Sequence, residues 1–125
     1  MASQLQGGKL KMSRKIYIWV DDVRPAPFAE WAWCKSVNSA IGSIELYENM
    51  GLDIGVISLD HDAGDFEKLG GDYIEILNWM ESTGRNHPIH IHTANPVGRE
   101  NMRRIVRKNN WKEIIGIYDS DFNEV

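Results

Sequence analysis

The sequence predicts an α/β protein: a three-layer sandwich built on a five-stranded, mainly parallel sheet. Short runs rich in β-branched and aromatic residues alternate with segments of helical periodicity, which is typical of this fold class. Three of these runs end in Asp or His residues, and ligands of open parallel sheets bind at the carboxyl ends of the strands. The length of 125 residues is enough for one such domain and too short to suggest two.

The first strand is predicted over Lys15 to Val20, an apolar and aromatic run that Asp21 ends. Pro25 and Pro27 interrupt the stretch that follows. The second strand is then expected from Trp31 to Val37. Because the segment between these strands is short, the first crossover helix is expected to be missing.

The remaining elements follow from spacing and from residues that begin or end helices. Apolar residues recur at helical spacing from Val37, and Gly51 is placed to end that helix. Asn95 and Pro96 are typical of an N-cap and a first helical residue, and they open a helix that reaches about Asn109. The other predicted elements are a strand from Ile54 to Leu59, a loop from Ala63 to Gly71, a helix from Asp72 to Ser82, and strands from Pro88 to His92 and from Ile114 to Tyr118.

Composition and termini bound the class of protein. Residues 1–13 are polar and aperiodic, so a disordered tail is expected before one domain at residues 14–125. The residues after Asp119 are too few for a helix after the fifth strand, so this last helix is expected to be missing. No apolar stretch approaches the roughly 18 residues that span a bilayer, and no secretory signal pattern is present, so no membrane contact and a cytoplasmic location are expected. Cys34 is a lone thiol without a disulfide partner. The net charge of −4 argues against nucleic-acid binding through bulk charge.

The polar residues at three strand ends are the candidate metal and catalytic groups. They are Asp21 and Asp22, then Asp60, His61 and Asp62, then His92. If the first and third strands are neighbours, their ends lie roughly 5 Å apart, and carboxylates from both can reach one cation. The oxygen ligands Asp21, Asp22 and Asp60 favour Mg²⁺ or Mn²⁺, while an added histidine shifts the preference toward Mn²⁺, Fe²⁺ or Zn²⁺.

A second set of residues is suited to hold phosphate. Thr93 and Asn95 lie at a predicted helix start, where free backbone N–H groups and the helix dipole favour anions. Arg99 is near this start, and Arg24 follows the first acid pair. We interpret His90 as a hydrogen-bonded core residue, and Arg103 and Arg107 as part of a solvated basic helix face.

The acid pair, Asp60 after "VISL" and Thr93 after the fourth strand resemble the receiver domain of response regulators. That resemblance implies a flavodoxin-like sheet, Mg²⁺ on the acids, phosphorylation of Asp60 and a phosphoryl contact from Thr93. The usual lysine after the fifth strand is absent, since Ile117, Tyr118 and Asp119 stand there. The chain more closely resembles cyclic-phosphate processing receiver-like domains, in the strings "WVDDVRPAP", "ISLDHDAG", "GGDYIEILNWME" and "IHIHTANPVGRENM".

Three functions follow from these patterns. The first is a metal-dependent phosphoesterase, in which Asp60, His61, Asp62 and His92 are catalytic, His61 or His92 carries the proton, and Arg24, Thr93, Asn95 and Arg99 hold phosphate. The resemblance implies that its substrates are cyclic phosphates of nucleotides or RNA ends. The second is a signalling receiver phosphorylated on Asp60. The third is a module that binds a nucleotide or another protein without catalysis.

Overall fold

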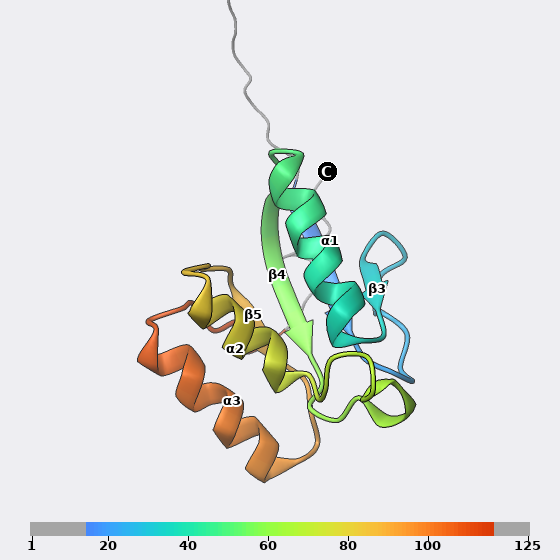
Figure 1. Ribbon diagram of the computed structural model, residues 1–125, viewed down its shortest axis with the longest axis vertical. Helices are drawn as coiled ribbons and strands as arrows, with labels where there is room; N and C mark the ends of the chain where they lie inside the picture. Colours follow the sequence, from blue (N-terminus) through green and yellow to red (C-terminus); the bar gives the residue numbers. More distant parts are fainter. Residues whose placement is uncertain (1–14, 117–125) are drawn as a thin grey trace, which may run out of the picture.

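The computed structural model describes residues 15–116, which form a parallel sheet of four strands with three α-helices packed on it (Figure 1). The strand order is β3-β2-β4-β5. The strands span Lys15–Val20 (β2), Ala32–Cys34 (β3), Asp53–Leu59 (β4) and Ile89–Ile91 (β5). The predicted α/β class is confirmed, and β2 has the predicted bounds.

A helix follows each of β3, β4 and β5. The helices are α1 (Val37–Asn49), α2 (Ile74–Ser82) and α3 (Pro96–Lys108), and a 3-10 turn, η1 (Gly64–Phe66), precedes α2. Ser36 begins α1 with a capping box, and Gly51 follows the helix with φ of 76°, a conformation that favours glycine. The Asn95 side chain accepts a backbone N–H of the first turn of α3 at 3.1 Å, and Pro96 is the first helical residue. The predicted start of α3 is therefore confirmed.

Three elements are shorter than predicted, and one of them is β5, which spans Ile89–Ile91 within the expected Pro88 to His92. The strand expected from Trp31 to Val37 ends at Cys34, because Ser36 already caps α1. The helix expected from Asp72 begins at Ile74, and the Asp72 carboxylate accepts a backbone N–H of the preceding loop at 2.9 Å. At α1 the Ser36 side chain, which bonds the backbone, decides where the helix starts.

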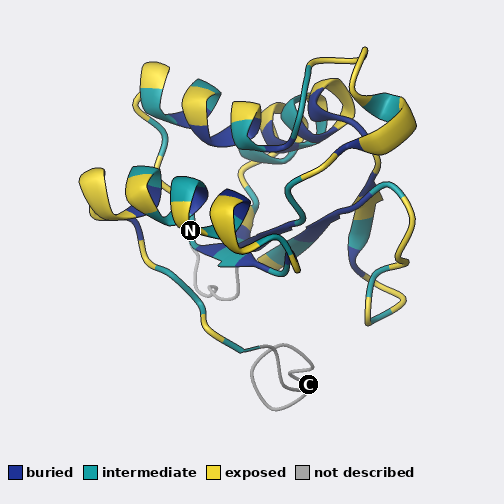
Figure 2. Ribbon diagram, turned by 90° about the horizontal axis from the view of Figure 1, so that it is seen from below, coloured by how far each residue is buried: buried dark blue, intermediate teal, exposed yellow. Residues whose placement is uncertain are grey.

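The two faces of the sheet bury different side chains. The face against the helices holds the main aliphatic core, which includes Ile18, Val20, Ile57, Leu59, Ile89 and Ile91, and Figure 2 shows the helices on this side. The opposite face carries Trp19 and Val56, which pack with Phe28 and Trp31 of segment 21–31. That segment has bends and turns, as Pro25 and Pro27 favour. Within the described residues a loop therefore stands in place of the predicted third layer.

A bulge sets the alternation of side chains along β4. Ile16 pairs with Ile54, but Tyr17 pairs with Val56, so Gly55 is an extra residue in the ladder. A Cβ on Gly55 would lie 2.3 Å from Cε1 of Tyr17, which explains the glycine. After the bulge, Val56 and the alternate residues of β4 face the loop-covered side of the sheet.

The fifth strand, expected from Ile114 to Tyr118, is represented in the described residues by one parallel bridge between Ile89 and Glu113. The Ile114 N–H also donates to the Ile89 carbonyl at 2.8 Å. The predictions for residues 1–13, for the end of this strand and for the segment after Asp119 lie outside the described residues. Between residues 15 and 116, no helix is both long enough and apolar enough to cross a bilayer.

Candidate functional site

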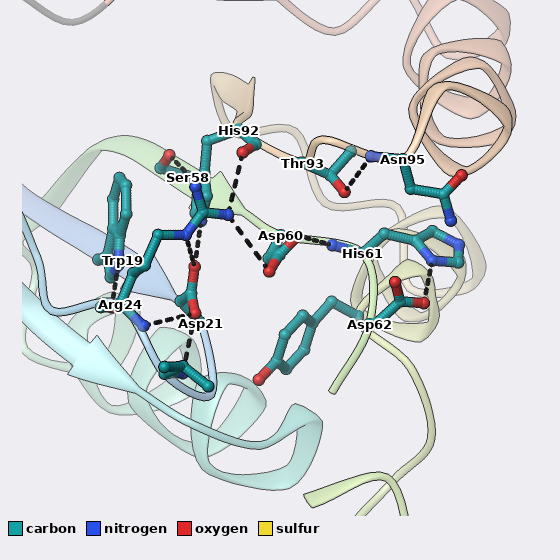
Figure 3. Close-up of polar contacts among 12 residues, drawn as sticks. Trp19, Asp21, Arg24, Ser58, Asp60, His61, Asp62, His92, Thr93 and Asn95 are labelled. Atoms are coloured by element: carbon teal, nitrogen blue, oxygen red, sulfur yellow. Dashed lines mark hydrogen bonds and ion pairs between the residues drawn. The ribbon is translucent and has the colours of Figure 1, made fainter. Parts of the chain in front are cut away.

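The carboxyl ends of β2, β4 and β5 bring three predicted site residues together. The last residues of these strands are register partners, so Asp21, Asp60 and His92, which follow them, lie side by side (Figure 3). Backbone hydrogen bonds continue past the strand ends, since Asp60 N–H donates to the Val20 carbonyl at 3.0 Å and His92 N–H to the Leu59 carbonyl at 2.8 Å. The carboxyl edge of the sheet, where the sequence placed the candidate site, therefore brings Asp21 and Asp60 together.

Asp21 is buried, and its hydrogen bonds use both carboxylate oxygens. Oδ1 accepts the backbone N–H groups of Val23 at 2.9 Å and Arg24 at 2.8 Å. Oδ2 accepts Arg24 Nε at 3.2 Å and His92 Nε2 at 2.9 Å. Burial by itself raises the pKa of Asp21, but these hydrogen bonds together lower it below the usual value. Asp21 is therefore a carboxylate at neutral pH, and the ring proton of His92 lies on Nε2.

The His92 ring is fixed by contacts at both nitrogens and by stacking. Its ring stacks on Trp19 with centroids 3.8 Å apart and planes inclined by 1°, and its Nδ1 lies 2.8 Å from the Ser58 hydroxyl oxygen. The side chain is only 8% exposed. Burial lowers its pKa to about 4, although Asp21 opposes that shift, so the ring is neutral at pH 7. With both ring nitrogens engaged, His92 is placed to orient Asp21 rather than to carry a substrate proton.

Arg24 connects the two carboxylates of the site. Its Nε contacts Asp21, while its Nη2 lies 3.4 Å from Oδ2 of Asp60 and 3.4 Å from the His92 carbonyl oxygen. The Arg24 side chain is 54% exposed, whereas its backbone carbonyl accepts the Trp19 indole N–H at 2.8 Å. The backbone of Arg24 is thus fixed, and its guanidinium stands at the surface of the site.

His61 is an oriented imidazole beside this centre. Its Nδ1 lies 2.9 Å from Oδ1 of Asp62, its N–H donates to Asp60 Oδ1 at 2.8 Å, and its carbonyl accepts the Tyr73 N–H at 3.0 Å. The ring packs on Gly98 of α3, where a Cβ would lie 2.5 Å from His61 Cγ. Nε2 of His61 has no hydrogen-bond partner in residues 15–116. Asp62 can therefore fix the tautomer while the second ring nitrogen stays open.

The loop between β5 and α3 carries two of the predicted phosphate ligands, Thr93 and Asn95. The buried Thr93 hydroxyl accepts the Asn95 N–H at 3.1 Å, which leaves its own proton available to donate. The Arg99 guanidinium donates to the Thr93 carbonyl, so this arginine stabilises the loop. Thr93 and Asn95 thus lie beside the start of a helix, where an anion is favoured, and Figure 3 places them on the His61 side of the site.

One group of side chains could hold a metal ion at the centre of the site. Ligand atoms of Asp21, Asp60 and His92 all lie within 4.8 Å of one another. Because both ring nitrogens of His92 already have partners, the carboxylates of Asp21 and Asp60 are the groups that would bind a divalent cation such as Mg²⁺ or Mn²⁺. Asp22, which was predicted as a ligand, lies outside this group. Its Oδ2 is 2.3 Å from the position of a Cβ on Gly64, whose φ of 55° holds the loop against it. His61, Asp62 and Asp72 form a second group of the same size.

Two residues that support the site were not predicted. Ser58 bonds the Nδ1 atoms of both His90, at 2.7 Å, and His92. It is a polar residue within an apolar strand, and that is the signal that could have indicated it. Tyr73 is buried and donates its hydroxyl proton to the Lys35 carbonyl at 2.7 Å; burial first, and then the charge of nearby acids such as Asp22, raises its pKa.

Arg103, Arg107 and His90 each have a hydrogen-bond or ion-pair partner. Arg107 is 62% exposed and pairs with Glu100 at 3.1 Å, as a solvated basic face predicts, whereas Arg103 is 29% exposed and pairs with Glu113 at 2.7 Å. Burial lowers the pKa of His90, which bonds Ser58 as a core residue. The basic side of α3 is therefore not part of the candidate site.

A parallel sheet in the order found here, with an acid pair after β2, an aspartate after β4 and a threonine after β5, defines a receiver-like α/β domain. The family model for the cyclic-phosphate processing receiver domain matches residues 16–108, and the chain belongs to this family. No curated protein and no solved structure matches the chain.

Proposed function

We propose that this protein is a metal-assisted phosphoesterase that opens cyclic phosphates of nucleotides or RNA ends. The observation that carries the proposal is the contact between Asp62 and His61 beside Asp60 and Thr93. A domain that only accepts a phosphoryl group on Asp60 needs no imidazole there. Hydrolysis needs a group that takes a proton from water and returns it to the leaving oxygen, and an oriented imidazole does both.

The reaction assigns a role to each side chain. The open Nε2 of His61 accepts a proton as water attacks phosphorus, and the same nitrogen returns a proton to the ribose oxygen as its bond to phosphorus breaks. Asp62 stabilises the imidazolium that forms between these steps. The Thr93 hydroxyl and the Arg24 guanidinium hold the non-bridging oxygens. The carboxylates of Asp21 and Asp60 would hold a Mg²⁺ or Mn²⁺ ion, which would supply positive charge against the developing charge of the phosphoryl group.

The test is turnover of a defined panel. The protein is incubated with Mg²⁺ or Mn²⁺ and with 2′,3′-cyclic nucleotides or a short RNA that ends in a cyclic phosphate, and products are separated chromatographically. We expect conversion to a phosphomonoester, and we expect His61→Asn to lower kcat by about 10²–10⁴-fold. His87→Asn is the matched control, because His87 also bonds a carboxylate, Glu48 at 2.6 Å, but lies before β5 at the opposite end of the sheet.

Hydrolysis of no panel member, or equal turnover by the wild type and His61→Asn, contradicts the proposal. The signalling alternative is distinguished from the phosphoesterase by adding a small phosphodonor to the same preparations and measuring their intact mass. Three results together would show that the domain is a receiver in function as well as in fold. The intact mass of the wild type rises by one phosphoryl group, the mass of Asp60→Asn does not, and the wild type hydrolyses no member of the panel.

A further inference from the structure

The carboxylate of Asp21 has no free acceptor position for a metal ion. A carboxylate offers about four such positions. Two backbone N–H groups fill those of Oδ1, and Arg24 Nε and His92 Nε2 fill those of Oδ2. A cation that binds Asp21 must therefore displace one of these donors.

Arg24 is the donor that can leave. The two backbone N–H groups belong to the turn that follows β2, and the His92 ring is 8% exposed and stacked on Trp19. The Arg24 guanidinium belongs to a side chain that is 54% exposed, and its contacts of 3.2 Å to Asp21 and 3.4 Å to Asp60 are longer than the 2.9 Å contact of His92. It also joins the two carboxylates, which both lie in the group that could hold a metal.

We propose that Arg24 and a divalent cation compete for Asp21 and Asp60, so that cation binding releases the Arg24 guanidinium to hold the phosphate. The inference rests on the proposed function for the identity of that phosphate group. In the metal-free site the Arg24 guanidinium offsets one of the two carboxylate charges. When a cation takes over this role, the guanidinium becomes free to form the two parallel hydrogen bonds that arginine makes to phosphate.

The anchored backbone keeps the released side chain at the site. The Arg24 N–H donates to Asp21, its carbonyl accepts the Trp19 indole N–H, and Pro25 follows. Only the Arg24 side chain therefore moves, and its guanidinium stays close to the edge of the sheet where Thr93 lies. By thermodynamic linkage the effect is reciprocal: an anion that draws Arg24 away from the carboxylates must strengthen cation binding by the same factor.

The experiment measures Mn²⁺ affinity by isothermal titration calorimetry, with and without inorganic phosphate, in the wild type, Arg24→Met and Arg24→Lys. Arg104→Met is the control, since it removes the same charge from an exposed arginine of α3 that donates to the amide oxygen of Asn101. We expect Arg24→Met to bind Mn²⁺ alone at least about fivefold more tightly than both the wild type and Arg104→Met, a factor in the range of typical coupling energies. Arg24→Lys, which lacks the Nε donor but keeps the charge, should lie between them.

Phosphate should strengthen Mn²⁺ binding by a larger factor in the wild type than in Arg24→Met. Equal Mn²⁺ affinities in Arg24→Met and the wild type overturn the proposal, and so does an increase no greater than that of Arg104→Met, because charge alone then explains it. Weaker Mn²⁺ binding by Arg24→Met, or binding by neither protein, also overturns it. These titrations need no turnover, so absence of hydrolysis with the expected affinities rejects the phosphoesterase and leaves the competition standing.

Discussion

The contact between Gly98 and His61 leads to a sharp prediction, because one methyl group added at Gly98 must either displace the His61 imidazole or destabilise the folded protein. A Cβ on Gly98 would lie 2.5 Å from Cγ, 2.6 Å from Cδ2 and 3.0 Å from Nδ1 of His61. Gly98 is buried in the first turn of α3, and its N–H is bonded to the Asn95 side chain at 3.1 Å. The helix is therefore the more rigid partner, and the His61 ring is the group expected to shift.

Two opposing terms set the size of the effect. Alanine is a better helix former than glycine by about 0.8–1 kcal/mol. Forcing extra volume into a packed contact costs about 1–3 kcal/mol. Gly98→Ala should therefore destabilise the wild type by up to about 2 kcal/mol, and should stabilise His61→Ala by up to about 1 kcal/mol, because the ring that opposes the methyl group is then gone.

Urea denaturation of the four proteins of this double-mutant cycle measures the two values. Gly42→Ala is the control for helix propensity, because Gly42 lies in α1 and no heavy atom is within 4 Å of its added Cβ. Gly42→Ala should stabilise both backgrounds equally. If Gly98→Ala also stabilises both backgrounds equally, the glycine does not hold the ring, and the reasoning that places His61 through α3 fails. In the turnover assay, Gly98→Ala should lower kcat, since the imidazole is displaced from its position beside Asp62.

Three further measurements test the site. With chelator present, the contribution of neutral His92 to the free energy of unfolding should be complete above about pH 6.5, which is the pKa of the residue in the unfolded chain. It should be lost as the pH falls toward about 4, the pKa of His92 in the folded protein, by up to about 1.4 kcal/mol per pH unit. Urea titrations at stepped pH measure this slope, and His92→Gln should flatten it. Asn95→Ala should lower the free energy of unfolding by about 1 kcal/mol through loss of the N-cap, whereas Asn95→Asp should retain most of it. Tyr73→Phe should destabilise the protein by about 1–2 kcal/mol, because the Lys35 carbonyl loses its donor, and an unchanged urea midpoint would contradict that account.

Much of the fold could be predicted from local patterns. The run from Lys15 to Val20 is rich in β-branched and aromatic residues, and the structure has a strand with those bounds. The start of α3 could be predicted because Asn95 and Pro96 act within one helical turn. The second strand was predicted too long, since the sequence pattern does not show that the Ser36 side chain bonds the backbone and starts α1.

The sequence by itself determined which residue types stand at the strand ends, because a parallel sheet aligns those ends whatever the side chains do. The tertiary structure decided what each of them contacts. His92 and Asp21 are 71 positions apart in the chain, and they meet because β2, β4 and β5 pair in one register. The same register turns His92 onto Trp19 and leaves His61 beside α3. Sequence spacing fixes only the face of a strand on which a residue lies, whereas hydrogen-bond partners and burial depend on neighbours that are distant in the chain.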